Sequence, residues 1–261
     1  LTLALGGDYL DLMDGNNTIN VLEPKLWNQE GKNLPELNTP EAFQKKTVVS
    51  QHLAFLRDFF RTYKNLSDAQ LDVVEILVRK LYLQWHISDH SDLSQKKSLD
   101  YPILSDLYAL ADETLKHYGE QRHAIYTEEL LRSVCLALYS ISSGADSRFF
   151  NGHTNIKSSR FVTFGVKSLL SADKNLRDAM LFNVLSYMSD QLLSFGNTVA
   201  TLDEFYLFLS NRTAVEYIRN FSKRVRKRDS AIIIASQNLE DFELPEIKEL
   251  TKPLFAIPTH Q

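Results

Sequence analysis

An unbroken apolar run constrains the fold of this chain more than any other feature. Residues 230–235 read Ser-Ala-Ile-Ile-Ile-Ala, and such a run is typical of a strand buried in a parallel sheet. Residues 160–164 and 198–202 also favour strands, and helical periodicity fills 173–195 and 212–227 between them. Strands that alternate with helices in this order predict an α/β layer joined by right-handed crossovers.

The middle of the chain has a different, wholly helical pattern. Thr39-Pro40-Glu41 predicts a helix start, because threonine can cap, proline fits the first helical turn, and glutamate suits the positive dipole end. Ser67-Asp68-Ala69-Gln70 has the spacing of a capping box, and further helices are predicted near 103–118 and 127–139. Four helices with short polar links predict an all-α subdomain.

Composition narrows the class of protein. Hydrophobic residues make up 44% of the 261 residues, which excludes a disordered chain and supplies a core. The formal net charge of −4 gives no overall attraction to nucleic acid or anionic lipid, so any such contact needs a local patch. Cys135 is the only cysteine, which favours a reducing compartment. No apolar stretch reaches the roughly 18 residues of a membrane-spanning helix.

Two carboxylates follow one of the predicted strands. Asp203 and Glu204 come directly after residues 198–202, at the end of the strand where open α/β sheets bind ligands. In a phosphate-transferring site, the first acid would hold the Mg²⁺ shell and the second would orient the attacking water. Two acids that merely cap the following helix would give the same pattern, so the residues alone leave both interpretations open.

A polar amide follows the other strand. Gln237 comes just after the run at 230–235, where its side chain can touch both a γ-phosphate and the catalytic water. The same glutamine could instead cap the next helix.

A basic run precedes that second strand. Residues 223–228 read Lys-Arg-Val-Arg-Lys-Arg, five basic residues in six. A solvated helix end explains them, because cations suit the negative dipole end of a helix. An arginine that reaches a neighbouring subunit's nucleotide, or a contact with nucleic-acid phosphates, explains them equally well.

Four segments taken together resemble one family. They are Thr201-Leu202-Asp203-Glu204-Phe205-Tyr206, Glu216-Tyr217-Ile218-Arg219, Arg226-Lys227 and Ala235-Ser236-Gln237-Asn238-Leu239-Glu240-Asp241-Phe242. These segments are similar to the ATPase of conjugative type IV secretion systems, the VirB-four, TraE and TrsE type. Gly6-Gly7 and Ile19-Asn20-Val21-Leu22 also match the family, so the resemblance covers nearly the whole chain.

The resemblance implies an α/β fold, a RecA-like P-loop NTPase core with a partial, mostly parallel sheet and an all-α insertion subdomain. Residues 1–36 and 149–261 would belong to the core, and residues 37–148 would form the insertion. The implied site residues are Asp203 as the Walker B metal ligand, Glu204 as the catalytic glutamate, Gln237 as the γ-phosphate sensor and Arg226 as a trans-acting arginine, with Arg224 and Arg228 as weaker candidates.

The implied activity is ATP hydrolysis with Mg²⁺, which would energise pilus or channel assembly and substrate passage. The implied partners are other components of the secretion channel and further copies of the chain, as a hexamer or a dimer. DNA contact would run through Lys223–Arg228. The expected location is the cytoplasm, at the inner face of the bacterial membrane.

One departure from the family matters. No G-x-x-x-x-G-K-[ST] loop occurs, and none of the 9 glycines is followed by Lys-Ser or Lys-Thr. The chain also starts at Leu1 without a methionine, so we expect a fragment of a longer protein that carries the loop upstream, and no ATPase activity from these residues alone. Two alternatives stay open: a DNA-pumping ATPase of the FtsK/HerA kind, and a non-catalytic interaction module that docks through the helical block.

Overall fold

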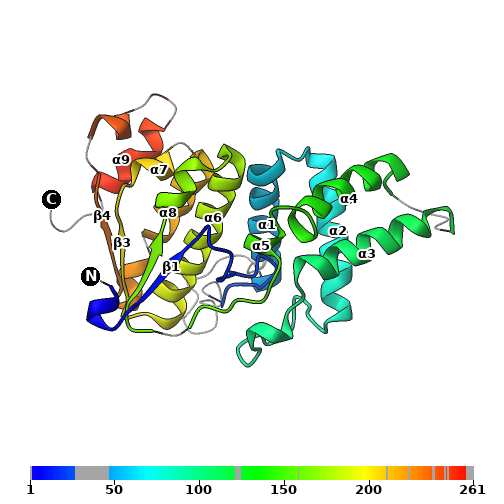
Figure 1. Ribbon diagram of the computed structural model, residues 1–261, viewed down its shortest axis with the longest axis horizontal. Helices are drawn as coiled ribbons and strands as arrows, with labels where there is room; N and C mark the ends of the chain where they lie inside the picture. The colour runs from blue at the N-terminus through cyan, green and yellow to red at the C-terminus, as the bar shows by residue number, and fades with distance from the viewer. Residues whose placement is uncertain are drawn as a thin grey trace, which may run out of the picture. The chain divides into compact units, whose positions relative to one another are not determined.

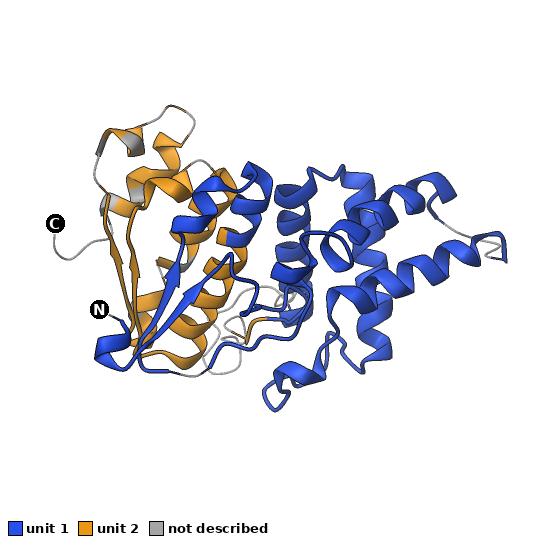
Figure 2. Ribbon diagram, in the orientation of Figure 1, with its two compact units in different colours: residues 1–24, 31–180 blue, residues 25–30, 181–261 orange. Residues whose placement is uncertain are grey.

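The computed structural model describes residues 2–26, 47–120, 125–157, 159–209, 211–222, 224–236, 239–243, 245 and 247–256. The chain divides into two compact units (Figure 2). Unit 1 comprises residues 1–24 and 31–180, and unit 2 comprises residues 25–30 and 181–261. This division follows contact density and does not test the boundaries at 36/37 and 148/149, which stay a prediction.

Helices dominate unit 1 (Figure 1). Its α-helices are α1 (Val48–Lys64), α2 (Asp68–Gln84), α3 (Leu104–Lys116), α4 (Glu128–Ser142) and the short α5 (Ser147–Phe150). Its 3₁₀ turns are η1 (Leu3–Leu5), η3 (Ser98–Asp100), η4 (Tyr118–Glu120) and η5 (Lys167–Ser171). The four long helices confirm the helical character predicted for this block, and the predicted start at Thr39-Pro40-Glu41 lies outside the described residues.

Polar side chains fix where α1 and α2 begin. Ser67 Oγ accepts the N–H of Gln70 at 3.3 Å, and Gln70 Oε1 accepts the N–H of Ser67 at 2.9 Å. The predicted capping box is therefore confirmed, and a cap of this kind contributes about 1 kcal/mol. Thr47 Oγ1 caps α1 by accepting the N–H of Ser50 at 3.0 Å.

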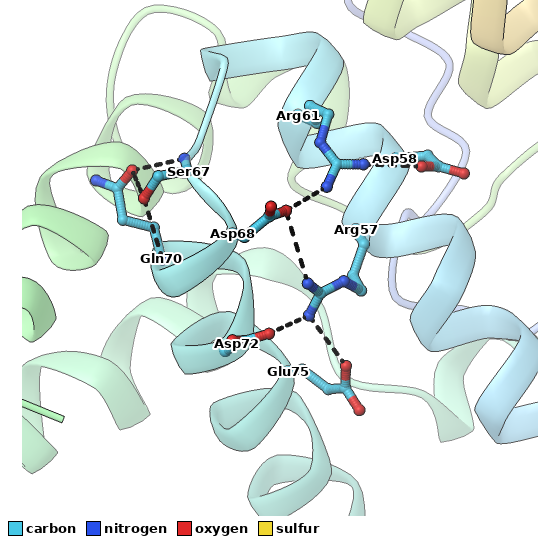
Figure 3. A network of polar contacts seen from close by, with 8 residues as sticks. All are labelled: Arg57, Asp58, Arg61, Ser67, Asp68, Gln70, Asp72 and Glu75. Atoms are coloured by element: carbon cyan, nitrogen blue, oxygen red, sulfur yellow. Dashed lines mark hydrogen bonds and ion pairs between the residues drawn. The ribbon is translucent and has the colours of Figure 1, made fainter. Parts of the chain in front are cut away.

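Ion pairs join α1 to α2 across the short link between them (Figure 3). Arg57 Nη1 lies 2.6 Å from Asp72 Oδ1 and 3.4 Å from Glu75 Oε2, while Arg61 Nη2 lies 2.6 Å from Asp68 Oδ1. The hydrogen bond to Asp72 raises the pKa of Arg57. The Asp68 and Asp72 side chains are 80% and 65% exposed, so these pairs orient the two helices more than they stabilise them.

An aromatic cluster forms the centre of this helical block. The Phe59 ring lies 5.4 Å from the rings of both Phe60 and Phe150, in edge-on arrangements that aromatic pairs prefer. Tyr63 packs beside them and donates its hydroxyl proton to Asp146 Oδ2 at 2.7 Å. Burial raises the pKa of Tyr63, so this hydrogen bond persists over the whole physiological range.

Two strands distant in the sequence pair within unit 1. β1 (Asp8–Asp11) and β2 (Val162–Gly165) run parallel, in register from Asp8↔Val162 to Asp11↔Gly165. The sequence predicted β2 at residues 160–164, with small differences at its ends. The helical block lies between them in the chain. Buried Asn20 ties the segment after β1 to that block, because its Nδ2 donates to the Pro102 carbonyl at 2.9 Å.

Unit 2 holds a second parallel pair. β3 (Val199–Leu202) and β4 (Ala231–Ile234) lie side by side, as the sequence predicted. The helical elements are α6 (Lys174–Asp190), which starts within unit 1, the π-helix η6 (Gln191–Phe195), α7 (Tyr206–Leu209), α8 (Arg212–Ser222), η7 (Val225–Arg228), η8 (Leu239–Glu243) and α9 (Lys248–Ala256). Among the described residues, no helix has the length and apolar content that crossing a bilayer requires.

Three details of the prediction for unit 2 are wrong. The helix predicted at 212–227 ends at Ser222, and 225–228 form a 3₁₀ turn that leads the chain directly into β4. The helix predicted at 173–195 is α-helical only to Asp190 and then widens into the π-helix. The apolar run in β4 is not buried on both faces, because Ile233 is 53% exposed. The described sheet has two strands, and only the face with Ala200 and Leu202 is covered.

Candidate functional site

The carboxyl ends of β3 and β4 form the frame of the candidate site. The two strands run in register from Val199↔Ala231 to Leu202↔Ile234, and α7 and α9 lie beyond their carboxyl ends (Figure 1). Two backbone bonds join the chain just past the strands. Ala235 donates its N–H to Leu202 O at 2.9 Å, and Phe205 donates its N–H to Ala235 O at 3.0 Å. Residues 203 and 204 are thus fixed next to the end of β4.

The structure places Asp203 and Glu204 at this edge in different surroundings. Asp203 is exposed, and its Oδ1 accepts the N–H of Glu204 at 3.0 Å. This bond is made ahead of α7 and not to an N–H of its first turn, which speaks against Asp203 as a simple helix cap. Glu204 is partly covered, and its Oε2 atom is buried.

Glu204 also has an unusual backbone. Its φ of 53° lies in the left-handed region, where a residue with a Cβ loses about 1–2 kcal/mol. The bond from Phe205 N to Ala235 O, together with that from Leu207 N to Glu204 O at 3.0 Å, holds this conformation. Such outliers persist only where the surroundings fix them, and they cluster at functional sites. Four other described residues, Asn65, His86, Asn197 and Asp229, share this left-handed backbone, so the catalytic role of Glu204 stays a prediction.

The end of β4 supplies the other side of the site. Ser236 follows Ala235 directly, and its Oγ is buried without a hydrogen-bond partner among the described residues. Gln237, the predicted γ-phosphate sensor, lies outside the described residues. Sequence reasoning named Gln237 and gave Ser236 no role, although both follow the same strand. A count of alternate residues from Ile232 and Ile234 would have placed Ser236 on the covered face.

The basic run lies at the opposite end of the strands. Arg228 O accepts the N–H of Asn197, two residues before β3, and Arg228 itself lies three residues before β4. At about 3.3 Å per strand residue, the length of β3 separates this end from Asp203 by roughly 13 Å. Arg224 and Arg228 are exposed, while Lys223 and the Arg226 side chain lie outside what the structure describes. The run is thus not adjacent to the carboxylates that follow β3 in the same chain.

Asp203 suits a magnesium ion that is bound mainly by substrate and water. Mg²⁺ takes oxygen ligands and commonly uses only one or two carboxylates beside phosphate oxygens and waters. Among the described residues, no group of three or more His, Cys, Asp or Glu could form a metal site by itself. The exposed carboxylate of Asp203 at the strand end fits a magnesium ion whose other ligands are phosphate oxygens and waters.

Comparison with known proteins finds a match among the solved structures. No protein-family model matches the sequence, and a search of curated proteins gives no match. Among solved structures, VirB4 of Thermoanaerobacter pseudethanolicus superposes with a TM-score of 0.80 at 25% sequence identity, over 98% of this chain. The chain spans 64% of that VirB4 chain. The resemblance indicated by the sequence motifs is therefore confirmed by the structure, as a VirB4-type fold.

Proposed function

We propose that this chain is part of the ATP-hydrolysing motor of a conjugative type IV secretion system, built on a RecA-like core. The observation that carries the proposal is the shared edge of β3 and β4, where Asp203 and Glu204 lie next to the end of β4. It stands beside the similarity to VirB4 over 98% of the chain. Open parallel sheets bind their ligands at this edge.

In this proposal ATP is the substrate, and each residue has one task. Asp203 holds the Mg²⁺ shell through a water, and bound Mg²⁺ would neutralise charge on the phosphates. Glu204 accepts the proton of the water that attacks the γ-phosphorus, while its fixed backbone keeps the carboxylate in place. Gln237 contacts the γ-phosphate from the neighbouring strand.

Arg226 is proposed to act on the nucleotide of a neighbouring subunit. The distance of about 13 Å along the strands supports action in trans, because the run that contains Arg226 lies at the amino ends of the strands and its own Asp203 follows a carboxyl end. This role requires further copies of the chain, as a hexamer or a dimer. The exposed residues Arg224 and Arg228 are further candidates, and the same run would serve a contact with DNA.

The cellular location and the partners of the chain follow from the same proposal. The motor would work in the cytoplasm against the inner face of the bacterial membrane, with other secretion components as partners. A second candidate function applies to these residues alone: without a G-x-x-x-x-G-K-[ST] loop they would act as a binding module and would not turn over ATP.

The test is Glu204→Gln in the full-length protein that the gene encodes. We expect ATP binding to persist while turnover falls by about 10²–10⁴, the effect of losing a positioned base. Asp203→Ala serves as a contrast, because it is expected to weaken the Mg²⁺-dependent part of ATP binding. Steady-state ATPase activity of Glu204→Gln within a few-fold of the unmodified protein would refute the proposed role.

A further inference from the structure

Ser236 is a buried hydroxyl without a hydrogen bond among the described residues. Its Oγ has less than 1 Å² of accessible surface and no partner there. A hydroxyl removed from water without a replacement bond costs free energy, so such groups are rare unless a ligand or an ordered water completes them. The position of Ser236 indicates which molecule supplies its missing hydrogen bond.

The backbone bonds past the strand ends bring the chain at Ser236 next to the chain at Glu204. Past the pair of Leu202 and Ile234, Ala235 O accepts the N–H of Phe205, so Glu204 directly precedes one partner of this bond and Ser236 directly follows the other. Alternate residues of a strand share a face, so Ser236 continues the face of Ile232 and Ile234. The strand pairing ends at Leu202, but the bonds between Leu202, Phe205 and Ala235 keep the two chains together beyond it.

Burial agrees with this placement. Ser236 Oγ and Glu204 Oε2 both lie below 1 Å² of accessible surface, at one edge of one two-stranded sheet. Ser236 Oγ has no direct bond to that carboxylate, because no partner satisfies it. A water molecule that bonds to both oxygens would satisfy the hydroxyl, as bound waters do for buried polar groups elsewhere.

We infer that Ser236 is a positioning residue that holds the attacking water together with Glu204. This inference rests on the proposed function. In the reaction, the water oxygen bonds to the γ-phosphorus, the bond from that phosphorus to the β,γ-bridging oxygen breaks, and Glu204 takes a water proton. Ser236 donates a hydrogen bond to a lone pair of the water oxygen and keeps its own proton throughout. It therefore aligns the nucleophile without changing charge.

A matched control exists in the same unit. Ser186 on α6 is 1% exposed, and its Oγ is likewise buried without a partner among the described residues. Unlike Ser236, it lies on a helix and not at the carboxyl end of a strand. Ser186→Ala therefore removes a similar buried hydroxyl away from the candidate site.

The experiment compares Ser236→Ala, Ser236→Thr and Ser186→Ala in the full-length protein. We expect Ser236→Ala to lower kcat by about 10–100-fold with KM for ATP changed by less than about twofold, because only the transition state needs an aligned water. Affinity for ADP should stay unchanged, while affinity for ADP with aluminium fluoride, a mimic of the transferring phosphoryl group, should fall. Ser236→Thr, which keeps the hydroxyl, should recover most of kcat, and Ser186→Ala should match the unmodified protein.

Stability separates positioning from packing. Without nucleotide, Ser236→Ala and Ser186→Ala should change the melting temperature by a similarly small amount, because each removes a buried hydroxyl that has no hydrogen-bond partner in the protein among the described residues. Suppose that Glu204→Gln is inactive, as the proposed function requires. Unchanged kcat in Ser236→Ala, or an equal loss of kcat in Ser186→Ala, would then overturn the inference about Ser236. If Glu204→Gln is itself fully active, the proposed function fails first.

Discussion

The left-handed backbone of Glu204 leads to a prediction that needs no nucleotide. Glycine adopts a φ of 53° without the penalty that a Cβ brings, so Glu204→Gly removes a strain of about 1–2 kcal/mol. The greater freedom of glycine in the unfolded chain returns about 0.5–1 kcal/mol of this gain. The net expectation is a protein more stable by up to about 1.5 kcal/mol. At this chain length such a gain raises the melting temperature by up to about 6 °C.

Asp203→Gly is the matched control. Asp203 is next in the chain and is not among the described residues with positive φ, so glycine there brings only the entropy cost and the loss of the bond to Glu204 N. We expect it to lose about 0.5–1 kcal/mol or more. Calorimetry gives the melting temperatures, and amide hydrogen exchange in β3 and β4 reports on unit 2 by itself. Equal destabilisation by the two glycine variants would refute the argument that Glu204 is strained.

Two further predictions concern the proposed motor. Arg226→Ala in the full-length protein should abolish turnover and leave ATP affinity unchanged. Mixing this variant with Glu204→Gln should restore part of the activity, because some subunit interfaces then pair an intact arginine with an intact base. Normal turnover of Arg226→Ala alone would refute the trans-acting role. The 261-residue chain by itself should show no shift in melting temperature with millimolar ATP. A ligand bound at 100 times its Kd would add about 2.7 kcal/mol to the free energy of unfolding. A shift of several degrees would therefore show that a phosphate site exists within these residues.

The parts of the fold that local chemistry determines could be predicted from the sequence. Ser67 and Gln70 carry the whole capping box within four residues, so the start of α2 was fixed without any tertiary contact. The β-branched runs gave β3 and β4, and the alternation of strands with helices gave their parallel pairing. Asp203 and Glu204 could be placed at the strand end for the same reason.

The parts of the fold that depend on contacts between residues distant in the sequence could not be predicted in this way. The 3₁₀ turn at Val225–Arg228 lies within the basic run, whose sequence would allow α8 to continue equally well. In the folded chain, Ser230 N bonds to Val225 O at 3.2 Å and turns the backbone into β4. The exposure of Ile233 likewise reflects how many strands share the sheet, which its own sequence does not encode. The left-handed Glu204 is held by Ala235, more than thirty residues away in sequence.

These distant contacts also change what the basic run can mean. On the sequence alone, a solvated helix end, a neighbour's nucleotide and nucleic-acid phosphates all explained the basic run at 223–228. The bond from Asn197 N to Arg228 O sets the run at the amino ends of β3 and β4, while the carboxylates occupy the carboxyl ends. Parallel strands do not fold back, so an arginine there must span the length of the sheet to reach its own Asp203. An extended arginine side chain is shorter than that span, which supports the proposed action on the nucleotide of a second molecule.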